Sequence, residues 1–398
     1  MSFNIALSGL NASNQELNTI SNNIANVSTT GFKESRTEFG SVYNGQQAGG
    51  VQVMGISQNF EATGSMSATG RSLDMALTGS GFFVVQDKNG QLSYTRSGVF
   101  GLDSQGNVIS NTGGSLQGYT VDGNNNLLAG SRGPLKVDMS SLEAKATNKV
   151  DFAANLDDRV DVIDIEDNPF DPKNVDSYNN SYTTPVYDSK GNEHTLTQYF
   201  VKTGDNTWKI HSIVDGDTST LTTTPATFDS KGNLASEETA YTISASAAGA
   251  NTLNITVDMT NLSQYGSDFV VSKNNPNGYT SGSFTDIRVE ANGMVYATYS
   301  NGQSLLQGQL VLANFNAPQE LMQTSNTAWT RTYGSGDPVY GIPGSGQFGE
   351  LASGVLEGSN VDLTSELVHL MSAQRNYQAN TKTITTADQL MMSLFNAV

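Results

Sequence analysis

Apolar residues recur every seven positions near both ends of the chain. Toward the N-terminus the repeat comprises Phe3, Leu10, Leu17 and Ile24, with Ile20 three positions after Leu17. Toward the C-terminus it comprises Leu356, Leu363, Leu370, Tyr377, Ile384 and Met391, with Leu394 three positions after Met391. A repeat of this length is typical of a coiled-coil seam. We therefore predict a helix at each end and assign these residues to an assembly interface.

The C-terminal repeat predicts one long helix. Neither Gly nor Pro occurs after Gly358, and Asn360 or Asp362 is placed to cap the helix start. Glu366 would then lie near the positive end of the helix dipole. A helix of about 36 residues is about 54 Å long. Such a helix cannot bury its own apolar stripe, so it needs a partner.

The N-terminal segment is a poor helix former on its own. Residues 1–27 contain seven Asn and a single charged residue, Glu16. Together the Asn residues cost roughly 4 to 5 kcal/mol relative to Ala, whereas burying an apolar side chain returns about 1.5 to 3 kcal/mol. We expect this segment to fold only when partner helices are present. Pairing of the two terminal helices within one chain is the alternative that stays open.

The uncharged polar face of the N-terminal segment suits hydrogen bonding to neighbouring helices or the lining of a water-filled lumen. An ordinary helix of low charge is the alternative explanation, and composition does not decide between them.

The middle of the chain has the alternation and turn residues of β-structure. All nine Pro lie between Pro134 and Pro343, which keeps Pro out of both predicted helices. We predict a mainly β body made of two β domains, one inserted in the other, with the terminal helices forming a coiled-coil-like inner layer. The predicted segments are an N-terminal helix at 1–30, an extended arm at 31–70, the first part of the β body at 71–144, an inserted outer β domain at 145–277, the second part of the body at 278–353 and the C-terminal helix at 354–398.

Individual strands are predicted from short apolar or alternating runs. They are 82–86, 92–96, 108–110, 195–201, 208–214, 241–246, 252–257, 286–290, 294–299 and 309–315. The motif Asp-Ser-x-Gly-Asn occurs at 103–107, 188–192 and 229–233. Asp at the first turn position and Gly-Asn later favour a hairpin connection. A calcium loop would need further oxygen ligands and a later bidentate Glu, which none of the three supplies.

Charge and composition exclude several classes of function. The net charge of −18 argues against a nucleic-acid binder, because phosphate neutralisation needs clustered Lys and Arg. Without Cys the chain has neither a disulfide nor a thiolate nucleophile. No apolar run approaches the ~18 residues of a membrane span, so we expect no membrane insertion. No Lys or Arg precedes Lys33, so we expect no cleaved secretory signal and, for an exported chain, a leaderless route.

Candidate sites for chemistry are weak, and we predict neither an enzyme nor a bound cofactor. Gly344-x-Gly346-x-x-Gly349 matches a dinucleotide-binding string, but it follows Pro343 in a Gly-Ser segment and is predicted to be a loop. An acidic segment at 157–171 favours a solvated loop over a cation site. The three histidines are His194, His211 and His369, and the last lies in the predicted C-terminal helix. The other two would bind zinc only with a third ligand that the sequence does not identify. No paired carboxylates or catalytic triad can be argued from spacing.

Three motifs give a resemblance that spans nearly the whole chain. The first is Asn22-Asn23-Ile24-Ala25-Asn26-Val27 through Thr30-Gly31-Phe32-Lys33. The second is Thr69-Gly70-Arg71-Ser72-Leu73-Asp74 through Gly79-Ser80-Gly81-Phe82-Phe83. The third runs from Gly354-Val355-Leu356-Glu357 into Gln374-Arg375-Asn376-Tyr377-Gln378-Ala379-Asn380. In this order they resemble the bacterial flagellar rod and hook family, and the insertion after residue 145 is similar to that of its hook members.

The resemblance implies a subunit of a flexible helical tube that carries motor torque to the flagellar filament. It implies terminal helices lining the inner tube, β domains outside and export of unfolded subunits. The implied partners are further copies of the chain, the distal rod protein, the hook cap protein, the hook-filament junction protein and the flagellar type III export apparatus. A surface adhesin and a carbohydrate-active β protein are the rival classes; tubes seen by negative-stain microscopy would separate the first, and paired carboxylates in a cleft would indicate the second.

Overall fold

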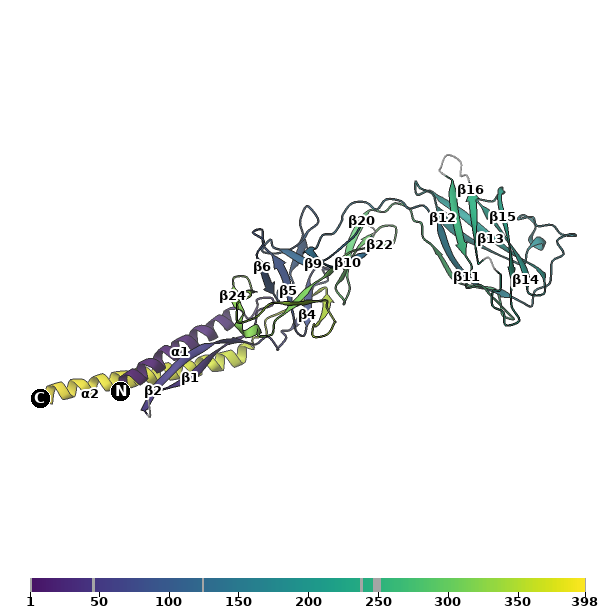
Figure 1. The fold of residues 1–398 in the computed structure, drawn as a ribbon. Helices are drawn as coiled ribbons and strands as arrows, with labels where there is room; N and C mark the ends of the chain where they lie inside the picture. The colour runs from purple at the N-terminus through teal and green to yellow at the C-terminus, as the bar shows by residue number, and fades with distance from the viewer. Residues whose placement is uncertain (1, 45–46, 124, 237–238, 246–251, 398) are drawn as a thin grey trace. The chain divides into compact units, whose positions relative to one another are not determined.

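In a computed structural model, the described residues are 2–44, 47–123, 125–236, 239–245 and 252–397. The chain divides into two compact units (Figure 1). Unit 1 comprises Met1–Met139, Asp286–Thr298 and Ser304–Val398, and unit 2 comprises Ser140–Thr285 and Tyr299–Gln303. Most of the regular structure is β, and the two terminal helices pack together within unit 1. The predicted fold class is confirmed.

The two helices are the first and last elements of the chain, and they lie side by side with the β1–β2 hairpin (residues 35–58) at one end of unit 1, the helical end (Figure 1). They are α1 (Ser2–Ala25) and α2 (Leu363–Ala397), of 24 and 35 residues. Asp362 caps α2, because its Oδ1 accepts a hydrogen bond of 2.7 Å from the backbone N–H of Ser365. The prediction that Leu356 belongs to the helical repeat is wrong. Leu356 lies in strand β28 (Val355–Glu357), where backbone pairing with β3 (Met66–Ala68) holds it extended.

The segment predicted as an extended arm contains a long antiparallel hairpin. Its strands are β1 (Ser35–Asn44) and β2 (Gln47–Gln58), and Ser35 lies opposite Gln58. A second antiparallel ribbon joins β4 (Met75–Thr78) to β27 (Glu350–Ser353). The β3–β28 and β4–β27 ribbons therefore bring the segments that lead out of α1 and into α2 side by side.

The body of unit 1 is a sheet of 13 strands, in which eight form the path β20-β21-β22-β9-β5-β6-β25-β24. Its core contains an edge-to-face aromatic cluster, with the rings of Phe82 and Trp329 5.6 Å apart. The strands are β5 (Phe82–Gln86), β6 (Leu92–Thr95), β7 (Phe100–Leu102), β8 (Val108–Ser110), β9 (Ser115–Val121), β10 (Leu127–Pro134), β20 (Phe284–Val289), β21 (Met294–Tyr299), β22 (Ser304–Leu310), β23 (Leu312–Asn314), β24 (Met322–Thr324), β25 (Ala328–Thr330) and β26 (Val339–Gly341).

Unit 2 is built from two sheets around one apolar core. One sheet has the order β16-β17-β11-β18, with β19 also paired to β11, and the other has the order β12-β13-β14-β15. The core includes Phe152, Phe200 and Trp208, each at most 2% exposed. The strands are β11 (Lys149–Asp157), β12 (Asn180–Tyr187), β13 (Glu193–Gly204), β14 (Thr207–Val214), β15 (Asp217–Thr227), β16 (Ala240–Ala245), β17 (Leu253–Asp258), β18 (Ser263–Tyr265) and β19 (Val270–Pro276).

The three Asp-Ser-x-Gly-Asn segments form turns of the same geometry, as predicted. In the first, Asp103 accepts hydrogen bonds from the backbone N–H groups of Gln105 and Asn107, both at 2.8 Å. The Gly of each motif has a positive φ, 82° at Gly106, 83° at Gly191 and 84° at Gly232. A residue with a side chain rarely adopts this backbone conformation, which explains the Gly at that position.

Two further predictions concern the second part of the body. The Gly344–Gly349 string is a loop between β26 and β27, as predicted. The predicted single strand 309–315 is instead two strands, because the backbone changes neighbours at Val311. β22 pairs with β9 before this residue, and β23 pairs with β5 after it.

In the inserted segment, the last residue of predicted strand 241–246 lies outside the described residues.

Candidate assembly interface

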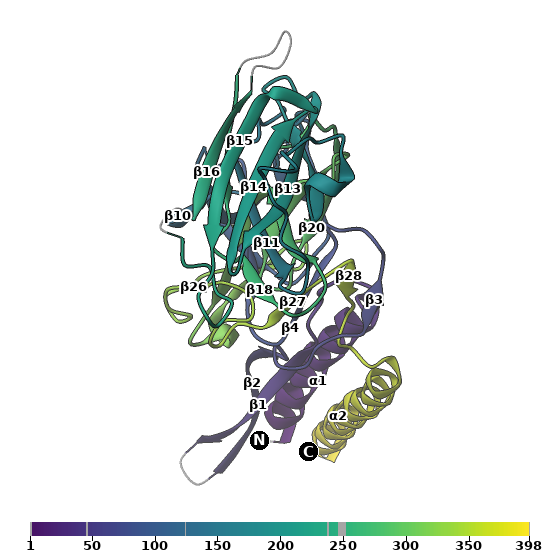
Figure 2. The same cartoon turned by 90° about the vertical axis from the view of Figure 1, so that its right-hand side faces the viewer.

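The two helices run antiparallel and side by side (Figures 1 and 2). Asn23 and Glu366 are neighbours, as are Glu16 and His369. At Gly9 the helices approach closely, since a Cβ there would lie 2.8 Å from Oδ1 of Asn380. The segment of α1 from Asn23 back to Gly9 thus runs alongside the segment of α2 from Glu366 to Asn380, and each segment contains fifteen residues. A Cβ at Gly9 would require the side chain of Asn380 to move.

One heptad stripe of α2 is shielded from solvent. Among residues 363–393, every described side chain outside this stripe is exposed. The stripe alternates steps of four and three residues, as a coiled-coil face does. Its members are Glu366, Leu370, Ala373, Tyr377, Asn380, Ile384 and Ala387. In the structure α1 covers this stripe within one chain, which is the arrangement that the sequence left open as an alternative.

The predicted interface residues divide between covered and exposed positions. On α1, Ile20 is buried, Leu10, Leu17 and Ile24 are half-buried, and Phe3 is 48% exposed. On α2, Leu363 and Met391 are 44% and 58% exposed. If the pairing of Gly9 with Asn380 continues, Ser2 lies near Ala387, so Met391 extends beyond the start of α1. The side chain of Leu394 lies outside the described part of the chain.

A second face of α1 holds the β1–β2 hairpin through polar contacts. Asn23 donates through Nδ2 to the carbonyl of Ser35 at 2.8 Å and accepts from the N–H of Ser35 at 3.0 Å. Thr37 donates to the hydroxyl of Thr19 at 3.0 Å, and the N–H of Val51 donates to the hydroxyl of Ser8 at 3.2 Å. Part of the uncharged polar face of α1 is therefore used within the chain.

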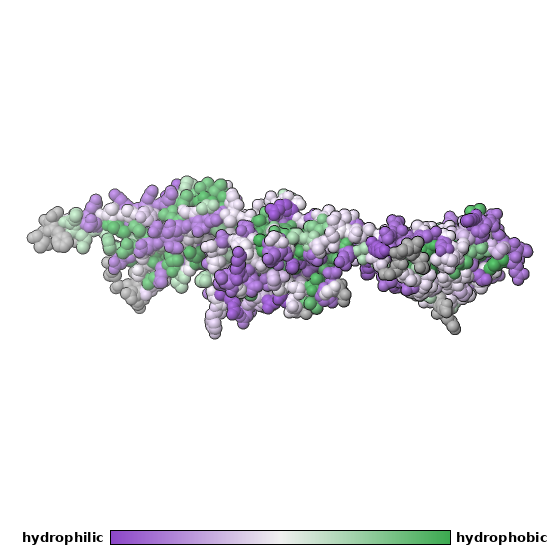
Figure 3. All heavy atoms as spheres, turned by 90° about the horizontal axis from the view of Figure 1, so that it is seen from above, coloured by the Kyte–Doolittle hydropathy of each residue, from purple (hydrophilic) through white to green (hydrophobic). Residues whose placement is uncertain are grey.

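Apolar side chains also remain exposed on the outer surfaces of the helical end (Figure 3). Leu367, Val368 and Met371 of α2 are 46% to 54% exposed. Met54 and Ile56 of β2 are exposed as well. These five residues lie outside the predicted seam, so the heptad repeat did not predict their exposure. Apolar residues at Leu367 and Met371, four positions apart, were the available signal of a second stripe.

A buried ion cluster ties the helical end to the body of unit 1. Lys33 Nζ lies 2.8 Å from Glu357 Oε1, and both side chains are fully buried. Arg96 Nη1 lies 3.6 Å from Glu357 Oε2, and its Nη2 donates to the carbonyl of Gly79 at 2.6 Å. Burial lowers the pKa of Lys33 and of Arg96, whereas Glu357 opposes this change. Each of the three motifs that carry the family resemblance contributes to this cluster. The first supplies Lys33, the second the carbonyl of Gly79 and the third Glu357.

Acidic groups lie between the two helices. Burial raises the pKa of Glu16, which the nearby His369 partly opposes. Burial likewise raises the pKa of Glu366, and Glu34 adds to the increase while Asn23 and His369 reduce it. Only Glu366 is buried, at 3% exposed, and its Oε2 has no hydrogen-bond partner among the described residues. The helix pair thus holds a buried carboxyl group that its own neighbours compensate incompletely.

The other candidate chemical groups are engaged in local contacts. His194 Nδ1 lies 2.6 Å from Asp215, and the ring of His211 stacks on Phe170. In the acidic segment, Asp157 pairs with Arg159. Within the described residues, no group of three His, Asp or Glu side chains is arranged to hold a metal ion. Neither helix, over its described length, has an apolar stretch sufficient to cross a membrane.

Four family models match consecutive parts of the chain. They are the flagella basal body rod protein (residues 3–33), the flagellar hook protein FlgE/F/G D1 domain (76–165), the flagellar basal body protein FlaE D2 domain (155–279) and the flagellar basal body rod FlgEFG protein C-terminal model (352–397). The crystal structure of the Helicobacter pylori flagellar hook protein FlgE2 has a similar fold, with a TM-score of 0.57 and 15% sequence identity. The match covers 73% of this chain and 100% of that one.

Curated relatives match over the full length. The chain is 38% identical to the flagellar hook protein FlgE of Salmonella typhimurium and 37% identical to that of Escherichia coli, covering 100% of both chains in each case. It is 32% identical to the Rhizobium meliloti protein of the same name over 98% of this chain and 97% of the relative. The chain belongs to the FlgE family of structural flagellar hook proteins.

Proposed function

We propose that copies of this chain assemble through their helical ends into a flexible tube that transmits motor torque as a universal joint and encloses an export channel. The observation that carries this proposal is the end of α2 beyond Ala387. There the antiparallel partner α1 no longer runs alongside, and Leu390, Met391 and Met392 are 58% to 62% exposed. Covering such side chains stabilises an assembly by about 1.5 to 3 kcal/mol each.

The geometry of the helical end favours an open polymer. The exposed end of α2 and the outer stripe of Leu367 and Met371 are different surfaces from the hairpin face with Met54 and Ile56. Contact between unlike surfaces is heterologous, and a heterologous contact that does not close builds a helical filament. Coverage of these apolar side chains by neighbouring copies would also complete the folding of the helical end.

The proposal extends to location and partners. At its two ends the tube would contact the distal rod protein and the hook-filament junction protein, and during growth it would contact the hook cap protein. Subunits would leave the cell unfolded through the flagellar type III export apparatus, without a cleaved signal peptide.

The segment organisation predicted from the sequence enters the same proposal. The helices at 1–30 and 354–398 would form the inner layer, and the inserted domain at 145–277 would lie outside. The compactness of unit 2, which comprises 140–285 and 299–303, supports an inserted domain with an independent core.

Leu390→Asp tests the assembly role of the α2 end. We expect this variant to form no tubes, because a charge placed in an apolar contact must be desolvated without a partner. Leu390→Met is the matched control and should polymerise. Negative-stain microscopy and sedimentation of the purified proteins give the result, and circular dichroism confirms that the body stays folded. Normal tubes from Leu390→Asp would contradict the proposal.

Leu17→Asp and Leu370→Asp test the seam itself. Because these half-buried residues lie on the paired helices, the charge should separate α1 from α2 and also block polymerisation, at a cost of several kcal/mol. If both variants form normal tubes, the seam between α1 and α2 is not needed for assembly.

A further inference from the structure

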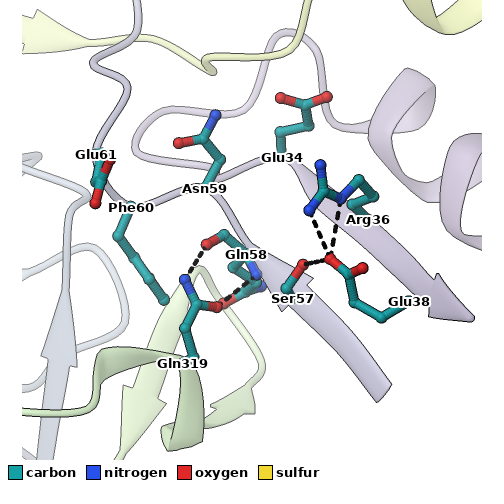
Figure 4. A pocket seen from close by; sticks show the side chains of 9 residues that line it. All are labelled: Glu34, Arg36, Glu38, Ser57, Gln58, Asn59, Phe60, Glu61 and Gln319. Carbon is teal, nitrogen blue, oxygen red and sulfur yellow. Dashed lines mark hydrogen bonds and ion pairs between the residues drawn. The ribbon is translucent and has the colours of Figure 1, made fainter. Parts of the chain in front are cut away.

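An acidic pocket lies where the β1–β2 hairpin meets the body of unit 1 (Figure 4). It has a volume of about 380 Å³ and is lined by Glu34, Arg36, Glu38, Ser57, Gln58, Asn59, Phe60, Glu61 and Gln319. Gln319 fixes its floor, because its side chain accepts from the N–H of Gln58 at 2.8 Å and donates to the carbonyl of Gln58 at 2.6 Å.

The pocket contains more negative than positive charge. Its cation, Arg36, is engaged by Glu38 at 2.7 Å. Glu34 and Glu61 form no ion pair with any described residue. Figure 4 shows these two carboxylates on opposite sides of Asn59, without interactions to the other residues drawn. The pocket therefore presents two carboxylates that a cation could neutralise.

A further carboxyl group, that of Glu366 on α2, lies next to Glu34 but is not part of the pocket lining. Its buried carboxyl group lies against Glu34, and Oε2 has no hydrogen-bond partner in the described part of the chain. The nearest cation candidate, His369, is 4.0 Å away and its side chain is 62% exposed. Two adjacent carboxylates, one of them buried, are unfavourable unless a proton or a cation compensates them.

The outward face of α2 carries a cation without a partner. Arg375 follows Ala373 by two residues, which places it about 200° around the helix from the stripe that faces α1. It is exposed and forms no ion pair with a described residue. Met371, one turn away on the same face, is 53% exposed. This face thus combines an apolar stripe with a free guanidinium.

We propose that Arg375 of one copy enters the Glu34/Glu61 pocket of a second copy, with Met371 packing on the exposed apolar residues beside the pocket. A planar guanidinium donates to two carboxylates at once, which a single ammonium does less well. The exposed Met54 and Ile56 precede Ser57 on β2 and supply the apolar surface. Within one chain Arg375 lies about 14 Å along α2 from Glu366 and faces away from α1, so the occupant is a neighbour.

This inference rests on the proposed self-assembly, and charge exchange tests it. Arg375→Glu should raise the protein concentration needed for polymerisation about tenfold, the effect of losing one well-ordered charged contact. Glu61→Arg should have a similar effect, and because Glu61 is exposed this variant keeps the fold. The double variant Arg375→Glu/Glu61→Arg should recover most of the loss. Lys382→Glu makes the same charge change two turns farther along the outward face and should have little effect.

The outcomes separate the two proposals. If wild-type chain forms tubes and Arg375→Glu polymerises at the same concentration, only this contact is overturned. Additive losses in the double variant overturn it as well. In a further outcome, the Arg375→Glu variant and wild type need the same concentration to polymerise, and that concentration falls for both as the pH falls. This result would overturn the contact and show that a proton compensates Glu34 and Glu366. Wild-type chain that never polymerises would remove the proposed function, and the contact with it.

Discussion

Unit 2 and the helical end of unit 1 differ in how far they bury their apolar side chains. Unit 2 encloses Phe152, Phe200 and Trp208 between two sheets, and its core residues are at most 7% exposed. The helical end leaves Leu367, Met371 and Leu390 between 46% and 62% exposed. The first region completes its folding within the chain. The second has more apolar surface than one chain covers, as expected for a part that is finished by neighbours.

Replacing 145–277 with a short Gly-Ser linker gives the largest test of this difference. We expect the variant to form tubes whose curvature and stiffness differ from wild type, because the helical end is intact. The replacement removes Lys145 and its bridge to Tyr279, but the bridge between Leu142 and Gly282 remains and keeps the joined ends near each other. Electron microscopy measures both properties. A folded variant that never polymerises would place the inserted segment in the main assembly contact.

Phe200→Ala against Leu390→Ala compares the two regions at single residues. Phe200 is fully buried, so its truncation should lower the free energy of unfolding of unit 2 by about 3 to 5 kcal/mol. Leu390 is 62% exposed, so its truncation should change the stability of the monomer by less than about 0.5 kcal/mol while weakening polymerisation. Urea unfolding followed by circular dichroism gives the stabilities. Equal losses in the two variants would contradict the comparison.

Acid should act on the two regions with opposite sign. Burial lowers the pKa of His211 in unit 2 to about 4 from an ordinary 6.5, so the unfolded chain binds the proton more readily. The stability of unit 2 should fall by up to about 3 kcal/mol as the pH drops from 6.5 to 4. The pKa of Glu16 and of Glu366 is raised in the folded helix pair, so the folded state binds these protons more tightly than the unfolded chain does. The stability of the helix pair therefore decreases as the pH rises through the raised pKa of each group.

Hydrogen exchange at pH 7 and pH 5 resolves the two regions separately. Protection should decrease in β13 and β14 and increase in α1 and α2 on acidification. His211→Phe keeps a flat ring against Phe170 and should reduce the acid sensitivity of unit 2 without affecting the helices. Loss of protection in both regions together would rule out this assignment.

Local patterns predicted the elements, whereas contacts distant in sequence decided their use. Apolar or alternating runs placed β5, β8 and β21 at the bounds that the structure has, and the Asp103 motif predicted its turn. The Lys33–Glu357 pair joins residues 324 positions apart, for which no local pattern gives a signal. The sequence predicted only an extended arm where the structure has the hairpin at 35–58. Polar groups of α1, such as Asn23, hold one end of this hairpin, and the local pattern of residues 31–70 does not encode that contact.

The same limit applies to the helical faces. Of the predicted α2 residues, Leu370, Tyr377 and Ile384 lie on the shielded stripe, whereas Leu363 and Met391 are exposed. The heptads did not predict that α1 starts near Ala387, that Leu356 pairs in a strand, or that Leu367 and Met371 form a second exposed face. Those outcomes depend on helix offset and on backbone pairing, which a repeat does not encode.

The smallest expected effect concerns the start of α2. The sequence offered Asn360 or Asp362 as its cap, and the structure gives them different roles. Asp362 accepts from Ser365 N–H, and that hydrogen bond keeps its pKa below the ordinary value. Asn360 instead accepts from the N–H of Glu34 at 2.7 Å and donates to the carbonyls of Asn59 and Ala62.

Asp362→Ala should therefore lower the stability of the helix pair by about 1 kcal/mol, the usual cost of losing an N-cap. Asp362→Ser keeps a capping oxygen and is the matched control. Hydrogen exchange should show faster exchange in the first turn of α2 for the Ala variant, with unit 2 unchanged because its core lies in a separate compact unit. If the Ser variant exchanges as fast as the Ala variant, the negative charge acting on the helix dipole matters more than the hydrogen bond.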